Sequence, residues 1–442
     1  MKTYKPFIIA SFVILLAGFG FWFFNSYGEW ENPLVRIDQD LSSVGKYATA
    51  HITFIDTKSG LRSTGVTIAQ GDRVAVLSSI NYPDAVTKET TVAITIDTTA
   101  LKLHDGPAVL NISATDNSFW KNQTTLTRQI TIDATPPQIF LLTATNNINP
   151  GGTCMILYKI SKPFTTTGVK VENQYFPGYV TTVSEKPCVI SYFSITPEAK
   201  AGAISIKVTA RDQGGNETAV NLPHLIRNKK FRSDKMVLSE TFLQQKMPEF
   251  QSHNPALQGK TQLDTFIYVN SQMRVDNDTA LREICQKSHP RQLWEGTFLR
   301  MKNAAPMALF GDKRTYQYQG KSIGESTHMG VDLASTANAP VEASNNGIVA
   351  YTGYLGIYGN IVVIDHGLGF FSIYGHLNGI DVQNGQEVKK GNIIGRTGST
   401  GLAGGDHLHF GLLIGGRFVN PQEWWDTHWI EDNISKKMTV SF

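Results

Sequence analysis

Cysteine and net charge are both scarce in this sequence. Only 3 of its 442 residues are cysteine and none forms a Cys-x-x-Cys pair, which excludes a cysteine-based zinc cluster. The 40 Lys and Arg residues nearly balance the 37 Asp and Glu residues, and the net charge is +3. This balance excludes a histone-like basic protein and a long acidic disordered tail, and it offers no basic patch for a nucleic-acid partner.

Glycine and histidine, by contrast, gather at one end of the chain. A length of 442 residues predicts about three domains, and 41% hydrophobic residues can supply sizeable cores. Of the 39 glycines, 20 lie between Ser322 and Gly416, and 6 of the 11 histidines lie from His328 onward. This segment is the feature that a functional interpretation has to explain.

The N-terminal residues differ from a globular sequence. Lys2 and Lys5 precede an apolar run from Phe7 to Phe24, and about eighteen helical residues span ~27 Å, close to the ~30 Å core of a bilayer. The flanking charges predict a transmembrane signal anchor over residues 1–30 with a cytoplasmic tip. A cleaved signal peptide is the alternative. Both export the rest of the chain; with the anchor retained, we expect a cell-envelope protein held in the inner membrane, with its bulk in the periplasm.

Export would place the cysteines in an oxidising compartment. There Cys154 and Cys188 could pair, which would leave Cys285 over. The alternative is that all of them are buried small apolar residues.

Residues 31–230 have the pattern of two β modules. Short Thr- and Val-rich runs alternate between turn signals, as in antiparallel sandwich strands. A motif ending in Asp116 recurs 96 residues later, ending in Asp212, and this spacing matches one immunoglobulin-sized domain. We expect Ig-like β-sandwich modules over residues 31–135 and 136–230, acting as spacers. The two aspartates could be calcium ligands, although carboxylates in turns more often bind their own backbone.

After the second module the periodicity becomes helical. Ser239 is placed to cap a helix that Pro248 then ends. Residues 231–305 are therefore expected to form a helical connector, which is either a packed spacer or a lid over the C-terminal domain. The remaining residues, 306–442, form this C-terminal domain, which carries the histidines.

Two motifs in this last domain have the spacing of metal ligands. His328 and Asp332 are four residues apart and His407 and His409 are two apart, so each pair faces one side of an extended strand. Zinc is commonly held by three nitrogen and oxygen ligands that leave a position for water. Two histidines and one aspartate would make such an open site, with His376 and one histidine of the pair left over.

The same residues resemble a known family. From about Phe310 to Trp429 the chain resembles the catalytic domain of the lysostaphin/LytM-type zinc metalloendopeptidases, whose pattern is His-x-x-x-Asp, a later single His, and His-x-His. Supporting context stands at 310–316 (FGDKRTY), 364–367 (IDHG) and 395–401 (GRTGSTG). The resemblance implies a mostly antiparallel β fold, the duplicated hybrid motif, over residues 306–442.

The resemblance also implies a role for each site residue. His328, Asp332 and His409 would hold one Zn²⁺ ion per catalytic domain. His376 and His407 would be the catalytic histidines beside a metal-activated water.

The two catalytic histidines are expected to act beside the metal-bound water, and either of them could be the stricter base. His407 would take or relay the water proton and later deliver one to the departing amine. His376 would donate a hydrogen bond to the developing oxyanion. Two further histidines, His366 and His428, are expected to be bystanders.

For the whole protein, the resemblance implies a zinc-dependent endopeptidase that hydrolyses peptide bonds in peptidoglycan, its partner, within a stem peptide or a cross-link. One alternative is a non-enzymatic envelope scaffold or activator of other cell-wall hydrolases, as degenerate family members are, but these lack zinc ligands that this chain keeps. The other alternative is a secreted protease acting on proteins, which cleavage of the N-terminus would favour.

Overall fold

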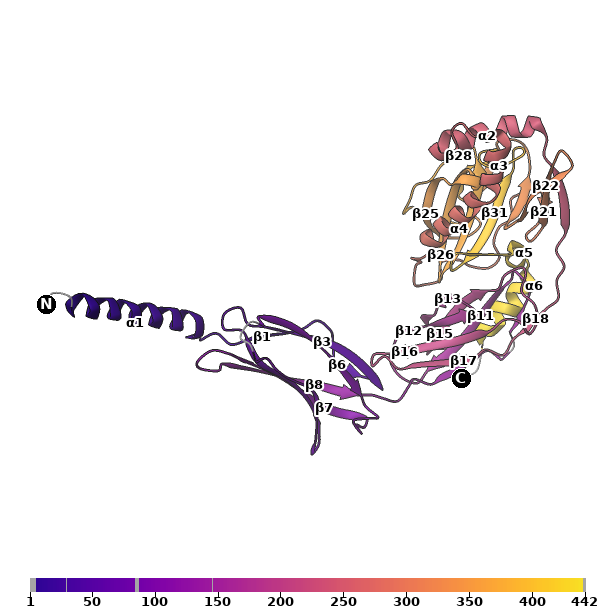
Figure 1. Cartoon of the computed structure of the whole chain (residues 1–442). Helices are drawn as coiled ribbons and strands as arrows, with labels where there is room; N and C mark the ends of the chain where they lie inside the picture. Colours follow the sequence, from indigo (N-terminus) through magenta and orange to yellow (C-terminus); the bar gives the residue numbers. More distant parts are fainter. Residues whose placement is uncertain (1–4, 29, 84–86, 145, 440–442) are drawn as a thin grey trace. The chain divides into compact units, whose positions relative to one another are not determined.

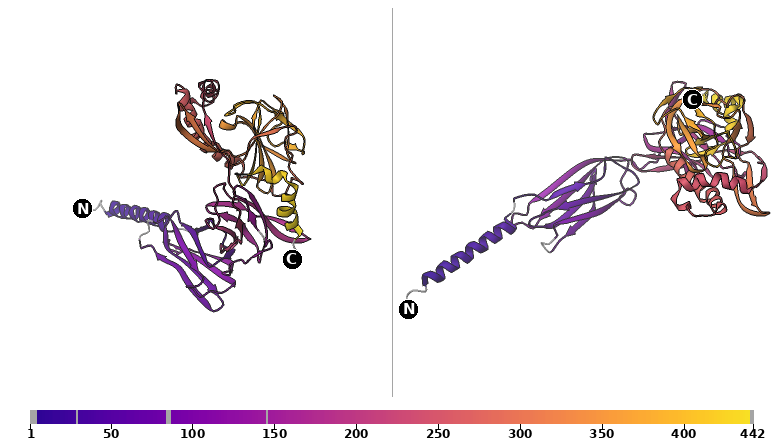
Figure 2. Two further views of the ribbon diagram at one scale, coloured as in Figure 1. Left: turned by 90° about the vertical axis from the view of Figure 1, so that its right-hand side faces the viewer. Right: turned by 90° about the horizontal axis from the view of Figure 1, so that it is seen from above.

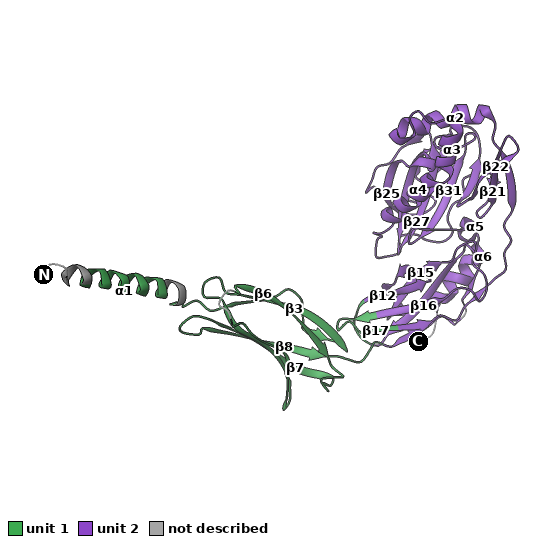
Figure 3. Ribbon diagram, viewed as in Figure 1, with its two compact units in different colours: residues 1–137, 162–165, 211–218 green, residues 138–161, 166–210, 219–442 purple. Residues whose placement is uncertain are grey.

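The computed structural model divides the chain into two compact units. The described residues are 5–28, 30–83, 87–144 and 146–439, without the side chains of 5–8 and 25–27. The first unit comprises residues 1–137 with the stretches 162–165 and 211–218, and the second comprises residues 138–161, 166–210 and 219–442 (green and purple in Figure 3). The division into five segments ending at residues 30, 135, 230, 305 and 442 remains a prediction.

The apolar N-terminal run folds as helix α1 (Lys5–Tyr27). Crossing a bilayer takes about 18 or more apolar residues in one helix, and no helix in the described part of the chain is both long and apolar enough. The predicted transmembrane anchor over residues 1–30, and with it the inner-membrane attachment, is therefore not supported. Lys2, one of the charges behind that prediction, lies outside the described residues.

Two β-sheets form the body of the first unit. Alternating side chains point between the sheets, so that Ile52, Phe54, Ile68 and Ile112 are fully buried in one cluster. The strand orders are β1–β3–β6 and β2–β8–β7–β4–β5. The strands are β1 (Leu34–Ile37), β2 (Ser43–Val44), β3 (Tyr47–Ile55), β4 (Leu61–Gln70), β5 (Arg73–Asn81), β6 (Glu89–Asp97), β7 (Gly106–Asp116) and β8 (Gln123–Ile132). The sheets fit the expected sandwich, while the Ig-like identity remains a prediction.

The two aspartates of the repeated motif close turns. Asp116 accepts hydrogen bonds from the N–H of Ser118 at 3.1 Å and the side-chain amide of Asn122 at 2.9 Å. Asp212 accepts from the N–H and the side-chain amide of Asn216, both at 2.9 Å. The two carboxylates therefore form hydrogen bonds within their own turns, which is the alternative to calcium binding.

The second module also consists of two sheets. Their orders are β14–β15–β11–β9 and β13–β12–β16–β17, with the short pair β10–β18 beside them. The strands are β9 (Ile139–Leu141), β10 (Asn147–Ile148), β11 (Thr153–Ile160), β12 (Phe164–Val171), β13 (Gln174–Pro177), β14 (Tyr179–Val183), β15 (Lys186–Ser194), β16 (Ile206–Asp212), β17 (Glu217–Asn221) and β18 (Leu225–Ile226).

The suggested pairing of cysteines in this module does not occur. All three cysteines of the chain lie in its described part, and all are free and buried. Cys154 and Cys188 lie on neighbouring strands, but Cys154 is opposite Phe193 in the register. Since that partner is five residues from Cys188, about 17 Å along the strand, no disulfide can join the two thiols.

The connector consists of a strand and three helices. Strand β19 (Ser233–Val237) pairs in parallel with β21 (Lys313–Tyr318) of the next domain. The helices are α2 (Glu240–His253), α3 (Gln262–Asn270) and α4 (Gln272–Ile284), with the 3₁₀ turn η1 (Pro255–Leu257), and they lie over the C-terminal sheet in Figure 1. Ser239 caps α2 as predicted, accepting from the N–H of Phe242 at 3.1 Å. The prediction that Pro248 ends this helix was wrong, because α2 continues beyond it to His253.

The C-terminal domain is mostly β, as predicted. Its main sheet has the order β20–β23–β31–β27–β26–β25–β29, with β32 on β31, and β24–β30–β28 and β19–β21–β22 form smaller sheets. The elements are β20 (Ala305–Ala308), β21 (Lys313–Tyr318), β22 (Lys321–Thr327), β23 (Val331–Ala334), β24 (Pro340–Glu342), β25 (Gly347–Tyr354), η2 (Gly356–Tyr358), β26 (Asn360–Gly367), β27 (Phe370–Leu377), β28 (Gly379–Ile380), β29 (Glu387–Val388), β30 (Ile393–Arg396), β31 (Leu408–Ile414) and β32 (Arg417–Val419). Neighbouring strands of the main sheet run antiparallel.

A buried glutamate joins this domain to the second module. The described part of the chain ends in α5 (Pro421–Trp425), α6 (Thr427–Ile430), a π turn (Glu431–Ser435) and a 3₁₀ turn (Lys436–Thr439), which lie against the second module in Figure 2. Glu423 accepts from the side-chain amide of Asn149 at 2.8 Å and from the N–H of Thr153 at 2.9 Å. Burial raises the pKa of Glu423 to about 7, against the lowering effect of these donors and of Lys229 and Arg227.

This raised pKa predicts a pH-dependent stability. Because folded Glu423 holds its proton up to about pH 7 and the unfolded chain releases it near 4.5, its contribution is complete below 4.5 and is lost as the pH rises through 7. The loss is on the order of 3 kcal/mol. Thermal unfolding across this window should show a smaller decline for Glu423→Gln than for the wild type. The exposed control Glu198→Gln should follow the wild type; an unchanged slope in Glu423→Gln would contradict the assignment.

Candidate active site

The two histidine motifs meet because β23 and β31 are neighbouring strands. Asp332 lies directly opposite His409 in their register. His328 precedes β23, and its backbone N–H donates to the carbonyl of Asp312 at 2.8 Å. Gly330 leaves room for this approach, because a Cβ there would be 2.6 Å from the His409 ring. The His-x-Gly-x-Asp spacing thus fits the packing of the second motif.

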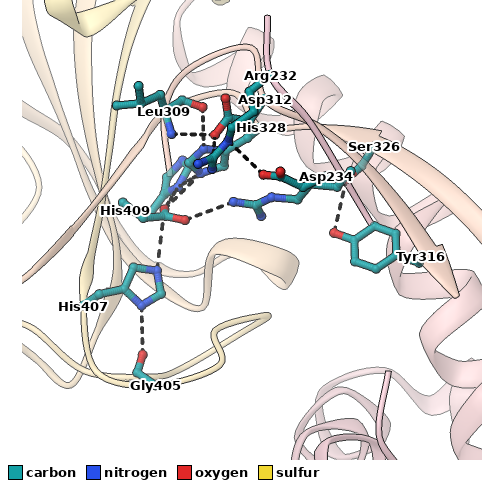
Figure 4. Close-up of polar contacts among 12 residues, drawn as sticks. Arg232, Asp234, Leu309, Asp312, Tyr316, Ser326, His328, Gly405, His407 and His409 are labelled. Carbon is teal, nitrogen blue, oxygen red and sulfur yellow. Dashed lines mark hydrogen bonds and ion pairs between the residues drawn. The ribbon is translucent and has the colours of Figure 1, made fainter. Parts of the chain in front are cut away.

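Three of the predicted residues converge on one point. His328 Nε2 and His409 Nδ1 each lie 2.9 Å from Asp332 Oδ1, and the two nitrogens are 3.2 Å apart. The histidines are 6% and 4% exposed and the aspartate side chain 13%. Figure 4 shows how His328, His409 and the nearby His407 face one another.

This donor set fits a metal ion. The Nδ1–H of His328 donates to the carbonyl of Leu309 at 3.0 Å, so in the neutral ring Nε2 carries a lone pair. That lone pair faces a carboxylate oxygen and a second imidazole nitrogen, which is unfavourable unless a cation or a proton lies among them. Two nitrogens and one oxygen within 4.8 Å of one another are a suitable set for zinc.

The charges around Asp332 fix its ionisation. Burial alone would raise the pKa of this carboxyl, but His328, with hydrogen bonds from His407 and His409, holds it well below its usual value. Its second oxygen, Oδ2, accepts from Arg314 Nη2 at 3.2 Å. Burial lowers the pKa of His409 to about 4, which keeps this imidazole neutral and able to donate a lone pair.

The two predicted catalytic histidines flank this group. His376 and His407 have ring centroids 4.8 Å apart. The Nδ1–H of His376 donates to the carbonyl of Thr400, and that of His407 to the carbonyl of Gly405, both at 2.8 Å. In the neutral rings both Nε2 atoms are therefore acceptors. His376 has a φ of 63°, a left-handed conformation that non-glycine residues adopt mainly where surrounding contacts impose it.

The surroundings shift the pKa values of the two histidines in opposite directions. Burial, with the neighbouring His407 and His409, lowers the pKa of His376 well below its ordinary value. Burial acts in the same direction on His407, but the hydrogen bond and charge of Asp332, 3.5 Å away, outweigh it and raise its pKa. His376 is thus kept neutral, whereas His407 holds a proton more readily.

A cavity of about 600 Å³ opens onto these side chains. The predicted residues His328, Asp332, His376, His407 and His409 all line it. Its other lining residues come from both the C-terminal domain and the connector, and most are apolar: Met236, Val237, Leu238, Ser239, Phe242, Phe266, Arg274, Met307, Ala308, Arg314, Tyr316, Ala334, Ile357, Tyr358, Leu402, Gly404, Gly405 and Asp406.

The expected bystanders lie elsewhere. His366 is fully buried, with Nε2 2.7 Å from Ser372 Oγ and Nδ1 2.7 Å from the carbonyl of Asn346. His428 is exposed on α6.

Sequence reasoning missed two groups of cavity residues. Arg314 was only part of a matching motif, and its contact with Asp332 depends on the pairing of β21 with β22, which precedes His328. The connector residues carry no motif, and only the burial pattern of their helices would have indicated that they pack on this domain.

Comparisons with known proteins agree with this geometry. Residues 326–421 match the model of peptidase family M23. The chain is 42% identical over 94 residues to a DD-carboxypeptidase/endopeptidase of Neisseria meningitidis, covering 21% of this chain and 22% of that protein. It is 43% identical over 93 residues to the peptidoglycan DD-endopeptidase ShyA of Vibrio cholerae, with the same two shares.

A solved structure adds a similarity to the lysostaphin catalytic domain of Staphylococcus simulans, at 28% identity and a TM-score of 0.24, covering 28% of this chain and 92% of that one. The matched part thus spans about a fifth of the two curated relatives. The resemblance drawn from the histidine motifs is confirmed: the C-terminal part of this chain carries a peptidase family M23 domain.

Proposed function

We propose that the protein is a zinc-dependent endopeptidase that hydrolyses peptide bonds in peptidoglycan, in a stem peptide or a cross-link. The observation that carries this proposal is the convergence of His328, Asp332 and His409, with His376 and His407 beside them in one cavity. The names of the two peptidoglycan-directed relatives support the substrate class. Such a substrate would place the protein in the cell envelope.

One zinc ion held by the first three residues would lower the pKa of a water molecule and polarise the scissile carbonyl. The chain's own histidines would then move the protons. Neutral His376, with its proton fixed on Nδ1 by the Thr400 carbonyl, offers Nε2 as the acceptor for the water proton. His407, which holds a proton more readily, delivers one to the departing amine. The sequence left open which of the two histidines is the stricter base, and this proposal gives that role to His376.

The cavity walls would position an extended peptide. Main-chain amides and carbonyls of such a peptide can pair with a strand edge, while apolar side chains such as Phe242 and Tyr358 exclude water around the reacting bond.

Removing a ligand and removing a catalytic group should have different effects. His409→Ala is expected to lose both bound zinc and hydrolysis, because two protein ligands cannot hold the ion firmly. His376→Ala is expected to keep the zinc but lose at least about 100-fold in rate. Zinc content by mass spectrometry and muropeptide release from purified peptidoglycan measure the two properties.

The exposed His428→Ala is the matched control and should retain both properties. A wild-type protein that binds no zinc would contradict the metal assignment. A zinc-loaded wild type that releases no muropeptide would instead support the scaffold alternative, and cleavage of unrelated proteins would support the secreted protease.

The contact between Arg314 and Asp332 predicts that replacing Arg314 lowers the affinity for the metal. Its guanidinium holds Asp332 Oδ2 at 3.2 Å, which leaves Oδ1 directed at the two histidines. Arg314→Met should weaken zinc binding about 10- to 100-fold, as loss of a group that orients a ligand does. Competition with a chelator measures this affinity. Exposed Lys313, the preceding residue on β21, supplies the control Lys313→Met, and equal affinities in the two variants would refute the role.

A further inference from the structure

The orientation of His376 depends on one peptide group. Its Nδ1–H donates to the carbonyl of Thr400 at 2.8 Å, and this carbonyl belongs to the peptide that joins Thr400 to Gly401. The loop that carries the peptide lies between β30 and β31. It is packed tightly, because a Cβ on Gly401 would lie 2.3 Å from the backbone nitrogen of Gly359. The position of this peptide therefore decides where His376 Nε2 points.

The other end of the same peptide group is held by the connector. The N–H of Gly401 donates to Glu249 Oε1 on helix α2 at 2.5 Å. One peptide plane thus joins a carboxylate to the imidazole: Glu249 accepts from its N–H, and its C=O accepts from His376. Hydrogen bonds in such a chain strengthen one another, and a carboxylate that orients a histidine is a recurrent arrangement in active sites.

Further contacts hold Glu249 in place. Lys246, one turn earlier on α2, lies 3.3 Å from Glu249 Oε2 and also donates to the carbonyl of Ser399. Tyr354 donates to Glu249 Oε1 at 3.3 Å and stacks on His253 at a centroid distance of 3.8 Å. The Glu249 side chain is 23% exposed, so these contacts are largely shielded from solvent.

Helix α2 itself is anchored in the fold. Leu243, Met247 and Phe250 on its inner side are at most 1% exposed. Asn277 on α4 supports the neighbouring turn, accepting from the N–H of Ile357 at 2.9 Å. These buried contacts are those of a fixed wall rather than of a lid that opens.

We infer that Glu249 is a positioning residue for His376, acting through the Thr400–Gly401 peptide group, and that α2 is an integral part of the active site. The expected effect of Glu249 on turnover rests on the proposed function. Its expected effect on the order of the Thr400–Gly401 loop rests on geometry alone. It gives the connector a catalytic purpose in place of the spacer or lid expected from the sequence.

Two measurements on the full-length, zinc-loaded protein test this inference. In Glu249→Ala, hydrogen exchange of the amides in residues 398–402 should accelerate, and kcat on a purified cross-linked muropeptide should fall about 10- to 100-fold with KM within about twofold, since a misdirected base affects the chemical step. Glu249→Gln keeps an oxygen that can accept from Gly401 and should restore most of both properties. Zinc content should stay at the wild-type level in both variants.

Gln245→Ala, at an exposed position on the same helix, is the matched control and should match the wild type. Wild-type or faster turnover in Glu249→Ala would overturn the inference, and faster turnover would make α2 a lid. Unchanged exchange in residues 398–402 would also overturn it. If the wild type hydrolyses no muropeptide, the proposed function fails, while the exchange measurement still decides the structural link.

Discussion

The antiparallel pairing of β23 with β31 is the constraint on which the site depends. It places Asp332 opposite His409 and, through the period of two residues, sets His407 on the same face. A slip of one residue in this register would turn the side chains of one strand to the opposite face and separate the ligands. The proposed metal site therefore depends on this sheet, in which Leu408, between the two histidines, and Phe410, after them, are buried.

A second constraint comes from outside the M23 match. Glu249 and Gly401 are 152 positions apart, yet their hydrogen bond links the connector to the peptide that orients His376. The cavity is likewise formed by both the connector and the C-terminal domain, since its walls include Phe242 and Arg274 from the connector helices. The matched residues 326–421 contain the five proposed site residues, but part of the cavity wall beside them lies earlier in the chain.

The sequence was sufficient for the site where the relation between residues is local. His-x-His defines a common face by strand periodicity, and the family resemblance rested on it together with His-x-x-x-Asp. The extended strand expected for the latter was wrong at His328, which precedes β23 and reaches Asp332 across a bend at Gly330. Prediction from the sequence failed where the residues in contact are far apart in the chain, or where tertiary packing overrides a local structural preference. Proline disfavours a helix interior, yet α2 continues through Pro248 because its buried residues hold it, and Glu249 lies just beyond the predicted end. Likewise, neither a strand register that separates Cys154 from Cys188 nor a sandwich topology can be derived from composition.

Two buried carboxylates illustrate how surroundings, rather than burial, decide a role. Asp332 and Glu423 are both largely excluded from water, and burial pushes both pKa values upward. Around Asp332 the imidazole of His328, with hydrogen bonds from His407 and His409, reverses this effect, so the carboxylate stays charged and suited to a cation. Around Glu423 the immediate partners are neutral amides, and burial prevails. The first carboxylate can therefore take part in metal chemistry, whereas the second links the catalytic domain to its neighbouring module.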